Sequence, residues 1–304
     1  MLKSTRNGEP LLKKLLFLLL LINTSVLAFY VYPEMTEPRL LALCFNHIGP
    51  ADNEKYDWSI SPQLFRQILD HLYTQGYQTV TSEQLADFVE GKGDIPEKAV
   101  YLAFAGAATS QVQVAIPELM MRDYHGTFFL RVEREEKKDQ LVGLSARKLM
   151  AGGEIQSHGR KQGEGFADIT NNDVAYYQRL CYEKLDTMEK DVLQLSGKKP
   201  IALIHPDGNP YERAFYYLET RGYRVAFTGN SGFINRSCHH FELPMNYIDD
   251  DDGLERVLWL LKYRRDETKL YGAACFVLAV FCLLWLGFCS APLGQKAVTE
   301  QKGE

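Results

Sequence analysis

The sequence predicts an α/β protein, a distorted (β/α) barrel in which parallel strands alternate with crossover helices; a doubly wound open sheet is the alternative. Short apolar runs alternate with amphipathic helical patterns from residue 39 to residue 263. Helix-start residues such as Ser61-Pro62 precede the helical patterns, and glycines such as Gly76 and Gly222 end them. A hydrophobic fraction of 46% and a charged fraction of 24% are those of an ordinary globular domain.

The strands are expected where aliphatic, aromatic and β-branched residues are concentrated between turn residues. In chain order they cover residues 39–47, 77–80, 99–107, 127–132, 154–157, 201–204 and 223–227. The helices are expected where apolar residues recur three and four positions apart. In chain order they cover residues 61–76, 83–90, 110–124, 144–151, 172–195, 212–221 and 253–263.

Both ends of the chain carry patterns that are typical of membrane segments. Residues 1–14 form a basic cytoplasmic tail, and the apolar residues 15–32 form either a transmembrane anchor or a signal peptide. Residues 270–291 contain no charge and are long enough to cross a bilayer, and a polar tail follows at 292–304. The flanking helices therefore enclose a domain at residues 33–269.

Charge predicts where this domain lies. The basic residues ahead of the first apolar run keep the N-terminus in the cytoplasm, so the domain is expected on the extracytoplasmic side of the cell membrane. Lys262, Arg264, Arg265 and Lys269 precede the second run and oppose this orientation. A net charge of −5 argues against a nucleic-acid partner.

The central strand, residues 99–107, ends in Ala105, Gly106 and Ala107. In α/β sheets, chemistry takes place at the carboxyl ends of the strands. None of these three residues has a side chain that binds a metal or moves a proton.

Seven segments between Leu40 and Thr228 resemble the polysaccharide deacetylases, carbohydrate esterase family 4 with the nodulation-type deacetylase domain. The layout is closest to the branch that acts on poly-N-acetylglucosamine. The segments are FNHIG, ISPQLFRQILDHLYTQGYQTVTSEQLADFVEG, KAVYLAFAGAATS, AIPELMMRDYHGTFFL, GGEIQSHG, IALIHPDGNPYERAF and GYRVAFTG. The resemblance implies a distorted (β/α) barrel of polysaccharide-deacetylase type.

The resemblance also implies a metal-dependent amide hydrolysis for which this chain lacks most of the residues. The family holds a divalent metal with one Asp and two His and uses a second Asp as the base that deprotonates water. Ala105 stands at the position of the base and Gly106 at the position of the Asp ligand. His158 stands at the first His, and Gln162 stands at the second. We therefore expect no catalytic residue at the family's base position, and His158 is the one remaining metal-ligand candidate.

Three functions remain open. The favoured one is a catalytically degenerate, membrane-anchored protein that binds N-acetylated envelope polysaccharide or a partner in its synthesis or export; this protein needs no cofactor. The second is an active N-deacetylase with a relocated site at His158, His205 and Asp207, which would need zinc, cobalt or nickel. The third is a structural membrane scaffold.

Overall fold

A computed structural model describes most of the chain between residues 38 and 262. The described ranges are 38–49, 59–106, 110–130, 143–159, 174–205 and 208–262, with the single positions 275, 278, 279 and 282. Residues 38–264 fold as one unit. The predicted tails and the run 15–32 lie outside the described residues, as does all of 270–291 except those four positions. No helix within the described ranges is long and apolar enough to cross a membrane.

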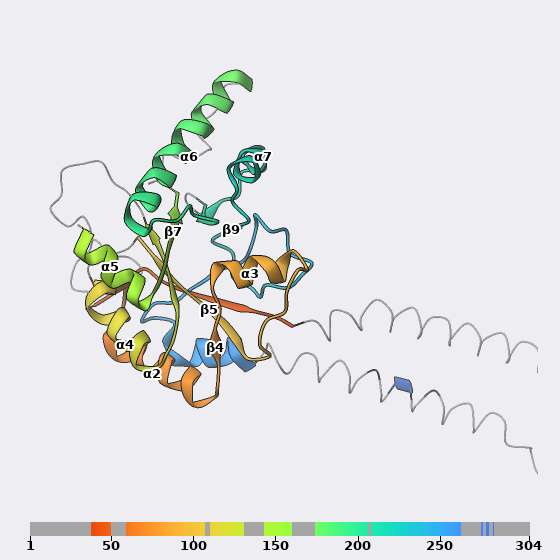
Figure 1. Ribbon diagram of the computed structural model, residues 1–304. Helices are drawn as coiled ribbons and strands as arrows, with labels where there is room; N and C mark the ends of the chain where they lie inside the picture. The colour runs from red at the N-terminus through yellow and green to blue at the C-terminus, as the bar shows by residue number, and fades with distance from the viewer. Residues whose placement is uncertain are drawn as a thin grey trace, which may run out of the picture. The chain divides into compact units, whose positions relative to one another are not determined.

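The central sheet is parallel throughout and has the order β10-β1-β5-β6-β7-β8-β9, with β4 paired to the start of β5 (Figure 1). Its strands are β1 (Leu41–Phe45), β4 (Gln78–Thr79), β5 (Ala99–Ala105), β6 (Gly126–Leu130), β7 (Gly153–His158), β8 (Ala202–Ile204), β9 (Val225–Phe227) and β10 (Asn246–Tyr247). A separate parallel pair is formed by β2 (His47–Ile48) and β3 (Ser59–Ile60).

The sheet curls into a half-barrel. The rings of Tyr101 on β5 and Phe227 on β9 stack with centroids 5.2 Å apart, although β6, β7 and β8 lie between these strands in the sheet. Residues 243–247 connect the two edges, because Leu243 bridges Phe227 while β10 pairs with β1. The expected barrel is therefore confirmed, and the doubly wound open sheet is wrong.

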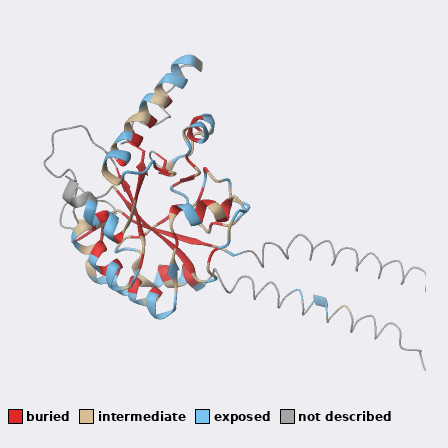
Figure 2. Ribbon diagram, in the orientation of Figure 1, coloured by how far each residue is buried: buried red, intermediate tan, exposed pale blue. Residues whose placement is uncertain are grey.

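Helices flank this sheet with their buried sides toward the strands, and all except α3 cover its convex face (Figure 2). They are α2 (Pro62–Thr74), α3 (Ser82–Val89), η1 (Gln111–Ala115), α4 (Ile116–Met121), α5 (Gly143–Gly152), α6 (Val174–Ser196) and α7 (Glu212–Arg221), followed by a helix at 253–262. Of these, α3 packs against the core on the concave face.

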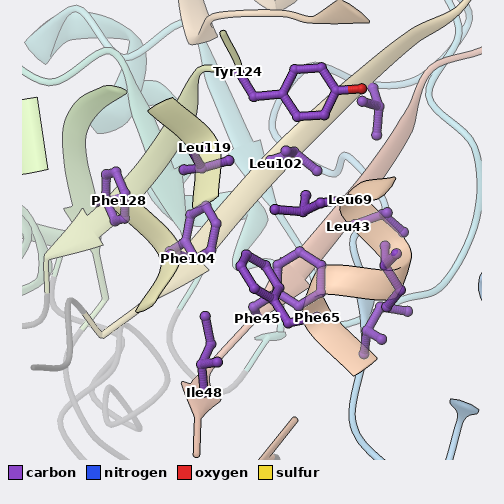
Figure 3. Close-up of a cluster of buried hydrophobic side chains, with 14 of the residues drawn as sticks. Leu43, Phe45, Ile48, Phe65, Leu69, Leu102, Phe104, Leu119, Tyr124 and Phe128 are labelled. Carbon is purple, nitrogen blue, oxygen red and sulfur yellow. The ribbon is translucent and has the colours of Figure 1, made fainter. Parts of the chain in front are cut away.

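Alternation along the strands separates two apolar layers. On the convex face, Phe45, Phe104 and Phe128 pack under α2 and α4, as Figure 3 shows with Phe65 and Leu119. On the concave face, side chains of β1, β5, β6, β8 and β9 fill the half-barrel. A third cluster lies between the sheet and the helices α6 and α7.

The expected helix starts are confirmed where a cap was identified. Ser61 caps α2 by accepting the N–H of Leu64, 3.3 Å away. The single helix expected at 110–124 is wrong, because it is divided into the π-helical turn η1 and the short α4. Pro117 lacks the N–H that an α-helix would pair with Gln113, and the N–H of Ile116 instead bonds Gln111 in π-helical spacing.

Candidate functional site

The carboxyl ends of the parallel strands form the mouth of the half-barrel. Among the family's positions, β5 brings Ala105 and Gly106 to the mouth, and β7 brings His158. The strand expected at 99–107 ends at Ala105, and the strand expected at 154–157 continues to His158. Ala107 and Gln162 lie outside the described residues.

Ala105 and Gly106 offer no ligand or base at the end of β5. Ala105 is buried on the concave face, in register with Phe129 of β6, and its methyl group belongs to the apolar core. Gly106 has a φ of +84°, and its N–H donates to the carbonyl of Phe129 over 2.9 Å. A Cβ added at Gly106 would meet no atom within 4 Å, so the space beside it is open.

His158 is the last residue of β7 and lies on the concave face. It pairs in register with Ile204, whose side chain belongs to the core of the half-barrel. The His158 side chain is buried, and its Nδ1 donates to the carbonyl of Gly159 over 2.7 Å, because a carbonyl oxygen can only accept. In the neutral ring, Nε2 is then the nitrogen that carries the lone pair.

His205 lies on the opposite face of the sheet. It follows Ile204 directly, so its side chain is directed toward α7, where its ring lies 6.0 Å from that of Phe215. Its Nε2 donates to the carbonyl of Phe241 over 2.8 Å. Burial lowers the pKa of His205 to about 4, and no described residue pairs with its buried Nδ1.

The structure therefore does not bring His158 and His205 together. The predicted relocated site requires both imidazoles on one side of the sheet, and alternation along the strand places them on opposite sides. Asp207, the third member of that site, lies outside the described residues.

The residues at the mouth do not fit the family's metal. In the part of the chain that the structure describes, no group of three or more His, Cys, Asp or Glu is placed to hold a metal ion. A catalytic zinc requires three protein ligands. Two of the four family positions are a methyl group at Ala105 and a bare backbone at Gly106, so His158 is the one imidazole among the family positions that the structure describes.

Gln111 is a residue of the mouth that the sequence analysis missed. Its side chain is fully buried, and Nε2 lies 2.7 Å from the carbonyl of Asn46 and 2.9 Å from the carbonyl of Ala105. One amide group thus joins the ends of β1 and β5. No sequence signal pointed to this contact, which joins positions far apart in the chain.

Polar groups from the neighbouring loops stand beside this contact. Ser110 Oγ lies 3.2 Å from His47 Nδ1 and accepts the N–H of Ile48 over 3.3 Å. Partial burial lowers the pKa of His47, which favours its neutral ring. Tyr247, half-buried on β10, pairs with Cys44 and packs against the concave core. The mouth therefore keeps an aromatic ring and several polar atoms.

A buried polar network lies deeper in the half-barrel, around Glu154. Its Oε1 accepts the N–H of Ser82 over 2.7 Å and the hydroxyl of Thr127 over 3.0 Å. Gln156 donates to Oε2 of Glu154 and accepts two N–H groups at the start of β8. Ser82 is the first residue of α3, so the carboxylate faces the positive end of that helix. This network has a structural role, because its bonds connect β6, β7, β8 and α3.

Comparison with protein-family models gives no match, and comparison with curated proteins gives none either. Solved structures do match. The deacetylase PplD of Streptococcus pyogenes, determined in complex with acetate, has a TM-score of 0.65 at 16% identity, over 74% of this chain and 99% of that one. A de-N-acetylase from Aggregatibacter actinomycetemcomitans has a TM-score of 0.60 at 18% identity, over 73% of this chain and 99% of that one. IcaB from Ammonifex degensii has a TM-score of 0.59 at 20% identity, over 74% of this chain and 97% of that one. The chain therefore has a polysaccharide deacetylase-like fold, as the sequence resemblance implied.

Proposed function

We propose that this chain is a membrane-anchored, catalytically degenerate relative of the polysaccharide deacetylases that binds N-acetylated polysaccharide of the cell envelope at the mouth of its half-barrel. The observation that carries the proposal is the end of β5, where Ala105 and Gly106 stand at the positions of the family's base and Asp ligand. The fold is kept, while the groups that would activate water are replaced.

Hydrolysis of an acetamide by the family's route needs a base and a polarising metal together. A methyl group accepts no proton, and one imidazole does not provide the three ligands of a catalytic zinc. The side chains at these positions therefore support binding and not turnover.

Binding depends on other groups, and the mouth retains them. A saccharide site needs a shaped surface with an aromatic ring and a few placed polar atoms, and no Lewis acid. Tyr247 provides the ring, and His47 and Ser110 provide nitrogen and oxygen atoms at the ends of β1 and η1. The bound chain would hold the polymer for a partner in its synthesis or export.

Restoring the family residues tests the proposal directly. The variant Ala105→Asp/Gly106→Asp/Gln162→His should gain zinc, measured by metal analysis of the purified full chain, and release acetate from N-acetylglucosamine oligomers. Space for the second carboxylate is open at Gly106, although its φ of +84° makes an Asp there cost about 1 kcal/mol.

The matched control adds His158→Ala to the restored variant and should lose the zinc again. A restored variant that takes up no zinc would show that these positions are not the family's metal site. Metal-dependent acetate release by the unaltered chain would favour the active N-deacetylase. Failure of the unaltered chain to bind the oligomers would favour the structural scaffold.

A further inference from the structure

The exposed large apolar side chains of the described domain are concentrated at the edge of the sheet opposite the mouth. We call this edge, where the strands begin, the amino edge. Six such side chains lie among the last four residues of helices that lead to it. They are Tyr73 of α2, Met120 and Met121 of α4, Met150 of α5, Leu193 of α6 and Trp259 of the helix at 253–262, with exposed fractions between 38% and 68%.

The chain path establishes that these helix ends lie at the amino edge. The helix α4 is followed by the start of β6, α5 by the start of β7, and α6 by the start of β8. The helix α2 leads into β4, which pairs with the first residues of β5. In a parallel sheet each crossover helix returns from the carboxyl ends of the strands to their amino ends. All four helices therefore end at the same edge.

The last helix, at 253–262, follows the same direction. Asp250, just before it, accepts the N–H of Ser61 over 2.8 Å, so this helix begins beside the start of α2. Val257, Leu260 and Leu261 then pack in the cluster that contains the buried side of α2. The helix thus runs back with α2 and carries Trp259, which is 52% exposed, toward the amino edge.

The described domain also begins at this edge. Leu40, the residue before β1, pairs with Ile234 at the beginning of the strand. The chain therefore enters the domain and leaves it at the amino edge. In the sequence, the apolar run 15–32 precedes this entry, and the run 270–291 follows this exit.

We infer that the amino edge is a lipid-contacting face, which places Trp259, Tyr73 and the methionines of α4 against the headgroup region of a bilayer. Tryptophan and tyrosine are favoured there because an apolar ring with a polar group suits the boundary between hydrocarbon and water. A monomeric domain rarely collects large exposed apolar side chains on one side without a surface to cover them. The inference rests on the proposed membrane anchoring and adds to it which face meets the lipid.

Charge at this edge is compatible with a lipid surface that carries some anionic headgroups. Lys198 and Lys199 are exposed beside the end of α6, and Lys262 is exposed at the end of the last helix. Basic residues near an anionic surface are attracted to it. With the amino edge on the bilayer, the mouth opens away from it, toward polymer in the surrounding envelope.

Fluorescence quenching by brominated lipids tests the inference on the full chain in nanodiscs of phosphatidylcholine and phosphatidylglycerol. The chain has three tryptophans, so Trp58→Phe/Trp285→Phe leaves Trp259 alone. We expect its emission to shift to the blue and to lose intensity when the bromines lie near the headgroups. If the double variant does not fold, the difference in quenching between the unaltered chain and Trp259→Phe gives the same quantity.

The matched control has its single tryptophan at the other end of the domain. Tyr176 lies in the first turn of α6, at the mouth side, and is 41% exposed. Tyr176→Trp, combined with Phe at all three natural tryptophans, should show neither shift nor loss. Quenching at both positions, or at neither, overturns the inference.

Alkaline washing of the membranes distinguishes a failure of the lipid-contacting face from a failure of the membrane anchoring. A chain that stays in the washed membrane while Trp259 is unquenched is anchored but does not use this face. If washing removes the chain, the anchoring proposal fails, and vesicles of the same lipids are added to the released protein. Quenching of Trp259 by those vesicles would still support the face, and its absence would reject it.

Discussion

Gln111 holds two strand ends in place with one amide group. Its Nε2 contacts the carbonyls of Asn46 and Ala105, so a Gln111→Leu variant keeps the size but leaves both buried acceptors without this donor. We expect the free energy of unfolding to fall by about 2–3 kcal/mol. Denaturant unfolding of the detergent-solubilised chain measures it. Gln113→Leu, an exposed position of the same turn, should change it by no more than about 0.5 kcal/mol.

The buried imidazole of His205 makes stability depend on pH. Its pKa falls from the ordinary value of 6.5 to about 4, so the folded state prefers the neutral ring. As the pH falls, His205 takes up a proton in the unfolded state before it does so in the folded state. The free energy of unfolding that this group contributes above pH 6.5 is therefore lost as the pH falls toward 4. A difference of 2.5 pH units (6.5 minus 4) corresponds to about 3 kcal/mol at 1.36 kcal/mol per unit.

Unfolding at a series of pH values checks this expectation. Between pH 7 and pH 4 the free energy of unfolding falls through His205 and through other groups. His205→Gln should remove most of the part that comes from His205. His239→Gln is the matched control, because it removes a histidine whose side chain is 46% exposed. A His205→Gln variant with the same pH dependence as the unaltered chain would contradict the assigned burial effect.

Tyr247 is the aromatic group through which the mouth is proposed to bind a saccharide. Tyr247→Ala should weaken the binding of N-acetylglucosamine oligomers by roughly tenfold, the equivalent of about 1.4 kcal/mol. Calorimetric titration measures the affinity. Tyr216→Ala removes a tyrosine that is 64% exposed on α7 and should leave the affinity unchanged. Equal losses in the two variants would place the saccharide elsewhere.

At the scale of elements, the pairing of β6 and β7 requires glycine at two facing positions. Gly126 and Gly153 are in register, and a Cβ on Gly153 would stand 1.7 Å from the Gly126 carbonyl oxygen. Gly153→Ala should therefore cost about 3 kcal/mol of stability. Gly93→Ala is the control. Its Cβ would lie 3.2 Å from the nearest atom, in the Asp87 side chain, and a shift of a few tenths of an ångström relieves that contact. A melting temperature that drops equally in both would contradict the tight pairing.

The regular elements were predictable because apolar residues recur in the sequence with the spacing of helices and strands. The strand that ends at Ala105 is a continuous apolar run, and the helix that begins after Ser61 has a capped, amphipathic pattern. The two-residue strands β3 and β10 were not expected, and β2 begins at His47, where the strand expected at 39–47 ends. The equally short β4 was expected at 77–80. The connection of the sheet edges by residues 243–247 depends on tertiary pairing, and no local pattern reports it.

The strand ends that carry the proposed site were predictable from the sequence. Ala105 and His158 lie at the carboxyl ends of β5 and β7, and their correspondence to the family's site stays a prediction. The contact of Gln111 with two strand ends and the face occupied by His205 were not predictable. Both depend on strand register and on contacts between residues far apart in the chain, and neither can be inferred from composition or from local spacing.

For the whole molecule, the fold is independent of the chemistry at its mouth. The convex and concave cores are apolar and complete, and the Glu154 network connects strands deep in the half-barrel. The proposed replacement of two carboxylates at the end of β5 would remove charges from the mouth and leave these cores complete. Under the proposed function, a deacetylase-like fold would therefore persist after its metal chemistry is lost.

The two proposals assign the domain two different partners, one at the mouth and one at the amino edge. The mouth is proposed to receive polysaccharide, and the amino edge is proposed to contact lipid. Since the strands run from one edge to the other, the two surfaces lie at opposite ends of the same parallel sheet. This arrangement would present a membrane-held binding site to the surrounding polymer.

The most direct test of the central claim is one NMR experiment on the full chain with an N-acetylglucosamine oligomer and zinc. The account predicts saturation transfer from the protein to the N-acetyl methyl groups, with no free acetate resonance growing over time. Acetate that accumulates with zinc and stops on His158→Ala would contradict the account, because the chain would then be a working deacetylase.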